Sequence, residues 1–288
     1  MTEPTPATAP PRTVRQRVVR WIKVVCLGLA LGYVGKIAVL MMLENSLVYH
    51  PAGPEDWTPP PSSLVQDVEL TSAAGDTIHG WWFPLEGSTG ALLYFHGNAG
   101  NLSARGHWMS VLREQLGQSV LIVDYPGYGK SSGSPNEAGC YAAADAAYDW
   151  LTKNQKIPGE NILIYGASLG GGIAVDLASR KPHRALILIK TFTSAPDVGQ
   201  EAYPWLPIRW LMRNRFDSLD KLANCKQPIF IAHGDADRVV PFSHGERLYA
   251  AAPGAKKFLR IPGGDHNDSL PGDFFEILKP FLAEATGK

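Results

Sequence analysis

The sequence predicts an α/β fold with a mostly parallel sheet and helices on both of its faces. Short, continuous apolar runs rich in β-branched and aromatic residues recur between residues 78 and 261. Stretches with the apolar spacing of a helix separate most of these runs, and strands that alternate with helices form parallel sheets buried on both sides. With 45% hydrophobic and 19% charged residues among 288, the chain can bury a substantial core.

The expected elements follow one another in a regular order. Strands are predicted at about 78–83, 91–95, 120–123, 161–165, 185–189, 228–232 and 257–261. Helices are predicted at about 103–116, 137–153, 170–181, 243–252 and 273–284. Residues 192–222 interrupt this rhythm with an irregular stretch that holds several Trp, Tyr and Leu residues, so we expect a short inserted cap there.

A membrane helix is expected at residues 24–43, ahead of the folded domain at 44–288. Lys36 is the only charge in this run of 20 residues, which is long enough to cross a bilayer. Residues 1–23 begin with Pro, Thr and Ala and are expected to form a disordered basic tail. Lys36 favours the alternative of a buried or amphipathic helix. A cleaved signal peptide would need a small-x-small cleavage site, and none follows.

The distribution of basic residues predicts how this helix would be oriented. No Lys or Arg stands between Lys36 and Arg105, whereas five basic residues precede the apolar run: Arg12, Arg15, Arg17, Arg20 and Lys23. The positive-inside rule then leaves the N-terminus in the cytoplasm and puts the domain at 44–288 in a periplasm or a lumen. Two glycosylation sequons, at residues 101–103 and 267–269, flank the expected site, which favours a periplasm over a glycosylating lumen.

Composition argues against several classes of partner. Lys plus Arg equals Asp plus Glu at 27 each, so net charge does not favour a nucleic acid. The three cysteines are scattered and form no CxxC pair, and no spaced cluster of His, Asp and Glu is typical of a metal site. We therefore expect neither a metal nor a cofactor, and the sequence does not indicate an oligomeric state.

A nucleophilic serine is predicted at the turn between a strand and a helix. The segment Gly166-Ala167-Ser168-Leu169-Gly170 follows the expected strand at 161–165 and precedes a helix. So tight a turn needs glycine on both sides of the serine, and it holds the hydroxyl clear of the sheet. In this context the motif indicates that Ser168 is a catalytic nucleophile.

A serine hydroxyl needs a base, and the base needs an acid to orient it. His266 lies in a glycine-rich loop between the last strand and the last helix, where the base belongs when the order is Ser, acid, His. Two aspartates compete for the acid in the loop after the strand at 228–232. Asp237 is preferred because it begins the turn that Val240 and Pro241 close, which leaves Asp235 as a turn residue that caps backbone N–H groups.

Backbone N–H groups are expected to bind the negative charge that develops on the substrate oxygen. The N–H of Leu169 stands at the start of a helix, whose dipole favours an anion. The glycine-rich segment 96–101 follows the strand at 91–95, and we assign the second donor to the N–H of Asn98. Taken alone, this segment is equally consistent with a tight loop that has no catalytic part.

Together these motifs resemble the α/β-hydrolase superfamily, and within it the membrane-anchored abhydrolase-domain proteins, also described as serine aminopeptidase-like hydrolases. The resemblance covers about residues 47–285. It rests on Leu47-Val48-Tyr49-His50-Pro51, HGNAGN at 96–101, DYPGYG at 124–129 with Ser131, the serine turn at 166–170, HGDAD at 233–237 and GDH at 264–266. It implies the same triad, Ser168, Asp237 and His266, with Asn98 and Leu169 as oxyanion donors.

The predicted activity is hydrolysis of a carboxylic ester or thioester through an acyl-enzyme. An aromatic cap beside a membrane helix suits a lipid-like acyl chain, although the same aromatic residues could form a packed core within the cap. A serine peptidase is the catalytic alternative, but no carboxylate is clearly placed to hold a substrate amine. A binding protein without catalytic activity is the third possibility, because fold does not imply function.

Overall fold

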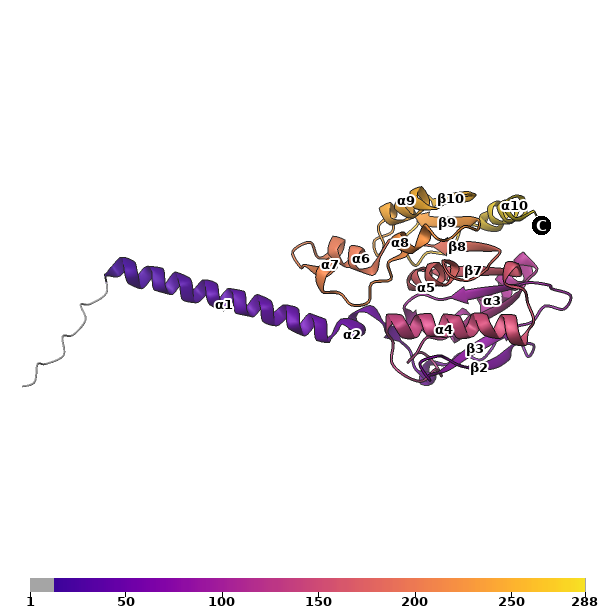
Figure 1. Cartoon of the computed structure of the whole chain (residues 1–288), viewed down its shortest axis with the longest axis horizontal. Helices are drawn as coiled ribbons and strands as arrows, with labels where there is room; N and C mark the ends of the chain where they lie inside the picture. The colour runs from indigo at the N-terminus through magenta and orange to yellow at the C-terminus, as the bar shows by residue number, and fades with distance from the viewer. Residues whose placement is uncertain (1–12, 288) are drawn as a thin grey trace, which may run out of the picture. The chain divides into compact units, whose positions relative to one another are not determined.

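The computed structural model describes residues 13–287 (Figure 1). The contacts within the chain divide it into two compact units, Met1–Glu44 and Asn45–Lys288. The first unit holds one long helix, and the second holds the sheet with its covering helices.

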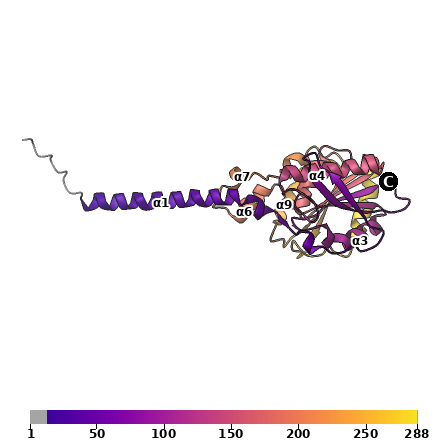
Figure 2. The ribbon, with the colours of Figure 1, turned by 90° about the horizontal axis from the view of Figure 1, so that it is seen from below.

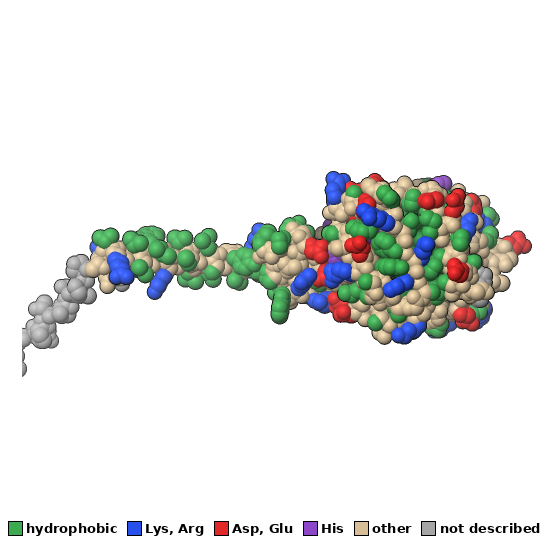
Figure 3. Space-filling model, turned by 90° about the horizontal axis from the view of Figure 1, so that it is seen from above, with side chains coloured by type: hydrophobic (Ala, Val, Ile, Leu, Met, Phe, Trp, Pro, Cys, Tyr) green, Lys and Arg blue, Asp and Glu red, His purple; other side chains and the backbone are tan. Residues whose placement is uncertain are grey.

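The helix of the first unit, α1 (Val14–Met42), begins earlier than the sequence predicts. Residues 1–12 of the expected disordered tail lie outside the described residues. Residues 14–23 are helical, so the prediction of disorder is wrong there. Thr13 and Gln16 form a reciprocal capping box that satisfies two backbone N–H groups and starts the helix ahead of the apolar run. Basic side chains gather near its N-terminal end, and hydrophobic ones cover most of the rest, where Lys36 is the one basic residue (Figure 3). By length and composition alone, α1 is a candidate membrane span.

An eight-stranded sheet lies at the centre of the second unit, in the order β10-β9-β8-β7-β4-β6-β3-β2. The strands are β2 (Gln66–Thr71), β3 (Thr77–Phe83), β4 (Ala91–Phe95), β6 (Ser119–Val123), β7 (Ile162–Ala167), β8 (Ala185–Ile189), β9 (Ile229–Gly234) and β10 (Lys256–Ile261). β3 pairs antiparallel with β2 and β6, and the remaining pairs are parallel. The predicted mostly parallel sheet is confirmed. β2 was not predicted, because four of its six residues are exposed and it lacks a continuous apolar run.

Helices cover both faces of the sheet, with α3 and α4 on opposite sides (Figure 2). The helices that follow α1 are α2 (Glu44–Val48), α3 (Gly106–Leu116), α4 (Glu137–Asp149), α5 (Leu169–Ala178), α6 (Ala195–Ala202), α7 (Ile208–Leu211), α8 (Ser218–Leu222), α9 (Phe242–Ala251) and α10 (Phe274–Thr286). Alternate residues of β4 enter the two hydrophobic cores: Leu93 packs in the core with α4 and α5, and Leu92 packs in the core with α3 and α10. This two-sided burial explains why the strands are continuously apolar.

The insertion predicted at residues 192–222 follows β8 and contains α6, α7 and α8. Since β4, β7, β8, β9 and β10 run parallel, the segments that leave their carboxyl ends meet at one edge of the sheet. These segments include the loop at 96–101, Ser168, the start of the insertion, and the loops that hold Asp237 and His266. The topology therefore brings all the predicted site residues to the same edge.

Candidate active site

Ser168 occupies a strained turn between β7 and α5. Its backbone has φ 52° and ψ −120°, a conformation that residues with a Cβ rarely adopt and that costs of order 1–3 kcal/mol. A Cβ on Gly166 would lie 2.6 Å from the Cα of Gly171, and a Cβ on Gly170 would lie 2.7 Å from the carbonyl oxygen of His96. Backbone occupies the space on both sides of the serine, which is why the motif requires its two glycines.

Ser168, His266 and Asp237 form one chain of hydrogen bonds. Ser168 Oγ lies 3.0 Å from His266 Nε2, and His266 Nδ1 lies 2.8 Å from Asp237 Oδ2. Because Nδ1 faces a carboxylate, it carries the imidazole proton, and Nε2 is then free to accept a proton from the serine hydroxyl. The Asp237 side chain is inaccessible to solvent, whereas the His266 side chain is 11% exposed, so a substrate can approach the base but not the acid.

The surroundings of Asp237 keep its carboxylate ionised. Oδ1 accepts hydrogen bonds from the N–H groups of Val239 (2.9 Å) and Val240 (2.8 Å), and His233 Nε2 lies 3.4 Å from Oδ2. Burial by itself would raise the pKa of Asp237, but the hydrogen bonds from His233, His266 and the Val240 N–H outweigh it and lower the pKa. A carboxylate that is charged at neutral pH therefore faces His266.

Asp235 points to different partners, although it precedes Asp237 by only two residues. Its Oδ1 accepts a hydrogen bond from the N–H of Gly263 at 2.6 Å, and its Oδ2 accepts one from Arg260 Nε at 2.8 Å. These contacts join the loop after β9 to the end of β10. The geometry thus gives Asp235 a structural contact and gives Asp237 the contact with the imidazole.

The loop that carries Asn98 lies beside the serine turn. A Cβ on Gly97 would be 3.5 Å from the Cβ of Ser168. No hydrogen bond from the N–H of Asn98 or of Leu169 is seen within residues 13–287. His96 Nδ1 lies 2.7 Å from the carbonyl oxygen of Gly97, which belongs to the same peptide group as the Asn98 N–H. By holding the oxygen, the imidazole fixes the direction in which that N–H points.

Residues distant in sequence hold this loop from the other side. The Asn98 carbonyl accepts hydrogen bonds from the His50 N–H (3.1 Å) and from the Tyr128 hydroxyl (2.8 Å), and the Tyr125 hydroxyl donates to the His96 carbonyl at 2.6 Å. His50 lies in the short strand β1 (His50–Pro51), which pairs with β5 (Ala99–Gly100). The segments 47–51 and 124–129 therefore shape the candidate oxyanion site.

Lys190 holds the loop of His266, and the sequence analysis did not identify it. It follows β8 with φ 48°, and its side chain is buried. Its Nζ donates to the carbonyl oxygens of Asp265 and Asp268, each at 2.7 Å, so the two bonds bracket His266. On the exposed side, Arg238 donates to the Asp265 carboxylate, whose Oδ1 also accepts the N–H of His266 at 2.8 Å.

A family model for the alpha/beta hydrolase fold matches residues 90–227. The uncharacterized protein Rv2307c of Mycobacterium tuberculosis (strain ATCC 25618 / H37Rv) is 38% identical over 259 residues, which are 87% of this chain and 91% of that protein. The alpha/beta hydrolase domain-containing protein WAV2 of Arabidopsis thaliana is 30% identical over 262 residues, with 82% and 85% of the two chains covered. This chain belongs to the α/β-hydrolase family. That membership supports hydrolase activity.

A solved structure of an esterase shows the same fold. The esterase Pf2001 of Pyrococcus furiosus superposes with a TM-score of 0.67 at 22% identity, over 83% of this chain and the whole of that one. The predicted fold class and the predicted resemblance to the superfamily are thus confirmed.

The structure brings together all five site residues that the sequence predicts in this α/β hydrolase. Four further residues contribute contacts that the sequence analysis missed: His96, Tyr128, Lys190 and His233. His233 belongs to the HGDAD motif at 233–237, which is the signal in the sequence that could have indicated it. Within residues 13–287 no group of His, Cys, Asp or Glu side chains could hold a metal ion.

Proposed function

We propose that this α/β hydrolase is a serine hydrolase that cleaves carboxylic esters or thioesters, with Ser168 as nucleophile, His266 as base and Asp237 as the acid that orients the base. The observation that carries the proposal is the unbroken chain of hydrogen bonds from Ser168 Oγ through the His266 ring to the buried Asp237 carboxylate. A nucleophile, a base and an orienting acid in that arrangement are the parts that acyl transfer requires.

Acylation begins when Ser168 Oγ attacks the carbonyl carbon of the substrate and its proton passes to His266 Nε2. The carbonyl π electrons move to the oxygen, and the N–H groups of Asn98 and Leu169 donate to this oxyanion. Asp237 stabilises the imidazolium without taking its proton. The tetrahedral intermediate then collapses, and the alcohol or thiol leaves with the proton that His266 returns.

Deacylation repeats these steps with water. His266 Nε2 takes a proton from a water molecule whose oxygen attacks the acyl-enzyme carbonyl. The second tetrahedral intermediate expels Ser168 Oγ, which recovers the proton from His266. The products are a carboxylic acid and the free enzyme, so neither a cofactor nor a metal is needed for the proposed reaction.

A lipid-like acyl chain is the substrate class we propose. The cap that follows β8 contains large aromatic side chains, and it begins at the carboxyl edge of the sheet at which Ser168 lies. The apolar helix α1, 29 residues long, suits an enzyme held where such acyl chains are concentrated.

For localisation, we propose a single-pass membrane protein with a cytoplasmic N-terminus and the catalytic unit in a periplasm or a lumen. The support is the positive-inside rule applied to Arg15, Arg17, Arg20 and Lys23, against a stretch with no Lys or Arg from residue 37 to residue 104. The test is protease treatment of sealed membranes after fractionation. Release of the protein by alkaline carbonate, or digestion of the catalytic unit only from the cytoplasmic side, would refute this localisation.

A fluorophosphonate probe tests the catalytic proposal directly, because it reacts only with an activated serine. Wild-type protein should be labelled, the adduct should map to Ser168, and a series of p-nitrophenyl esters of increasing acyl length should define the preferred chain. Absence of labelling in folded protein would refute the serine mechanism. A labelled enzyme that prefers the shortest acyl chains would refute the lipid-like substrate alone.

A further inference from the structure

The cap displays large aromatic side chains to solvent. Trp210 is 88% exposed, and Tyr203 and Trp205 are 53% and 54% exposed. Tyr203 and Trp205 meet edge to face with their ring centroids 6.4 Å apart. Exposed aromatic groups on this scale are typical of surfaces that bind a partner, and Trp and Tyr in particular favour the interface between water and lipid. These three residues and Arg209 lie within eight residues of the chain, 203–210, and we call them together the aromatic face of the cap.

The cap at 192–222 is neutral as a whole, with four basic and four acidic residues, but its arginines gather in one part of it. From Tyr203 to Phe216 the chain contains three arginines and no Asp or Glu. Acids outside this segment pair with arginines within it: Arg209 pairs with Asp197 and Arg215 with Asp217, each at 2.8 Å. The Arg209 and Arg215 side chains remain 53% and 45% exposed, so lipid phosphates could contact the same guanidinium groups. Aromatic rings beside arginines complement an anionic lipid surface better than they complement a neutral one.

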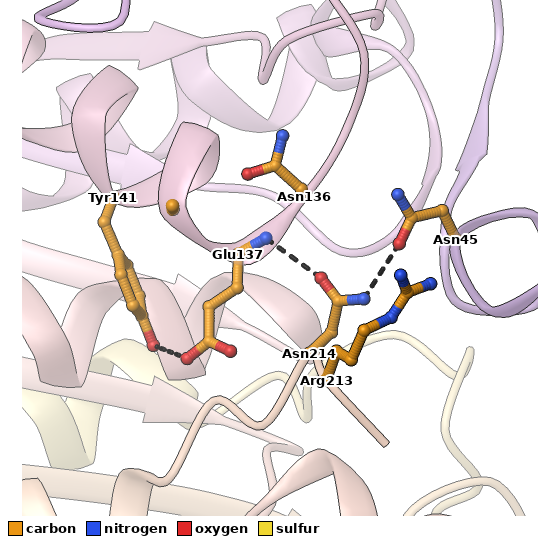
Figure 4. Close-up of a pocket in the computed structure, with 7 residues that line it drawn as sticks. Asn45, Asn136, Glu137, Tyr141, Arg213 and Asn214 are labelled. Atoms are coloured by element: carbon orange, nitrogen blue, oxygen red, sulfur yellow. Dashed lines mark hydrogen bonds between the residues drawn. The ribbon is translucent and has the colours of Figure 1, made fainter. Parts of the chain in front are cut away.

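The start of the catalytic unit is tied to the cap segment. Asn214 Nδ2 donates to Asn45 Oδ1 at 2.9 Å, and Asn214 Oδ1 accepts the Glu137 N–H at 3.0 Å (Figure 4). The same Oδ1 accepts the Tyr49 hydroxyl at 2.8 Å. Asn45, Glu137 and Asn214 border a pocket of about 400 Å³ whose lining includes none of the predicted catalytic or oxyanion residues. The Glu137 carboxylate also accepts the N–H groups of Arg215 and Phe216, at 2.6 and 2.9 Å. The cap segment is therefore held firmly to the body.

Chain length then limits how far this segment can lie from a membrane. Asn45 follows Met42, the last residue of α1, by three residues. Three residues span at most about 11 Å when fully extended. If α1 crosses a bilayer, Asn45 lies within roughly that distance of the end of the helix, in whatever direction the helix runs, and the cap residue Asn214 is hydrogen-bonded to it.

We propose that the aromatic face of the cap binds the surface of a bilayer that contains anionic lipids. This inference rests on the proposed membrane anchor. Lipid binding is then a function of the cap that is separate from catalysis by the triad. Since the cap leaves β8 at the carboxyl edge where Ser168 follows β7, contact of the cap with lipid holds the catalytic edge near acyl chains at the membrane surface.

Tryptophan quenching in the full-length protein tests the proposal. The protein is reconstituted into phosphatidylcholine vesicles that contain phosphatidylglycerol and lipids brominated near the headgroup end of their acyl chains. The emission that Trp210→Phe removes should be strongly quenched by the brominated lipid. Trp21→Phe reports separately on α1, in which Trp21 is 70% exposed. Trp108→Phe, a change at a partly buried residue of α3, is the matched control and should remove only unquenched emission.

The outcomes separate the cap from the anchor and from catalysis. Quenching at both Trp21 and Trp210 supports the proposal, and weaker quenching at Trp210 without phosphatidylglycerol supports its anionic part. If the brominated lipid quenches Trp21 but not Trp210, the cap proposal is overturned and the membrane anchor stands. Cross-linked dimers would then identify a second copy of this chain as the partner that covers the aromatic face of the cap. Quenching at neither overturns both. Fluorophosphonate labelling of each variant reports on the serine mechanism independently.

Discussion

The edge of the sheet that holds Ser168 and the cap that follows β8 differ in how far their important side chains are exposed to solvent. At the edge, the acid of the triad is buried and hydrogen-bonded: the Asp237 carboxylate accepts two backbone N–H groups and contacts two imidazoles. In the cap, Trp210 is 88% exposed. Buried polar groups must be paired because an unpaired one costs free energy, whereas an exposed aromatic group gains only when a partner covers it. Burial and hydrogen bonds therefore fix the positions of groups at the edge, whereas the exposed rings of the cap can contact a partner.

Removing the nucleophile should have the largest effect. Ser168→Ala deletes one hydroxyl from a turn whose shape depends on its glycines, so the fold should persist. We expect kcat for a soluble ester to fall by about 10⁴-fold or more, with loss of fluorophosphonate labelling. Turnover near that of the wild type, with an unchanged circular dichroism spectrum, would contradict the assignment of the nucleophile.

The two aspartates of the loop after β9 should respond differently to the same change. Asp237→Asn keeps the size of the side chain but cannot stabilise the imidazolium, and we expect kcat to fall by up to about 10⁴-fold. Asp235→Asn disturbs only the contacts with Gly263 and Arg260 and should cost less than about tenfold. Steady-state kinetics on both variants decide the matter, and the reverse ranking would assign the acid to Asp235.

The two cations that hold the His266 loop provide a matched pair. Lys190→Met removes both bonds to the carbonyls of Asp265 and Asp268 and lets the imidazole shift. A shift of about 1 Å can cost up to roughly a hundredfold in kcat. Arg238→Gln alters an exposed contact and should change kcat only slightly. Lys190→Arg, which keeps the charge and the donors, should recover part of the loss. If Lys190→Met and Arg238→Gln lowered kcat equally, the burial of Lys190 would not explain how it holds the His266 loop.

The depressed pKa of Asp237 predicts how stability depends on pH. Because the folded state lowers this pKa below its ordinary value of 3.8, the charged carboxylate stabilises the fold fully above about pH 4. That contribution is lost as the pH falls through the folded pKa. The difference in unfolding free energy between the wild type and Asp237→Asn should therefore be constant near neutral pH and shrink below about pH 4, as measured by urea unfolding. A difference that does not vary down to pH 3 would contradict the assigned contacts.

The smallest effect should come from the cap. Trp210→Phe should leave kcat for a short, water-soluble ester within about twofold, because the ring is 88% exposed. The same variant should slow hydrolysis of a long-chain ester presented in anionic vesicles. A large loss on the soluble ester would show that the ring supports the catalytic edge and would remove the contrast between the two regions.

Sequence alone determined the fold class and the candidate nucleophile, base and acid. Few folds without a parallel sheet accommodate continuous apolar strands that alternate with helices. The motif of the nucleophile is local, because it needs only a serine between two glycines at a strand-to-helix turn. Chain order then led to His266 and to the loop with two aspartates. The prediction of disorder at 14–23 was wrong because a capping box of only two side chains was overlooked.

Only the tertiary structure decided which groups hold these residues in place. His266 lies 98 residues from Ser168, Lys190 Nζ bonds carbonyls 75 and 78 residues away, and Tyr128 reaches Asn98 across 30 residues. Backbone carbonyls carry no sequence signature, so a lysine that binds two of them looks like any other lysine until the chain is folded. The two aspartates differ for the same reason, since the path of the backbone directs one to Gly263 and the other to His266.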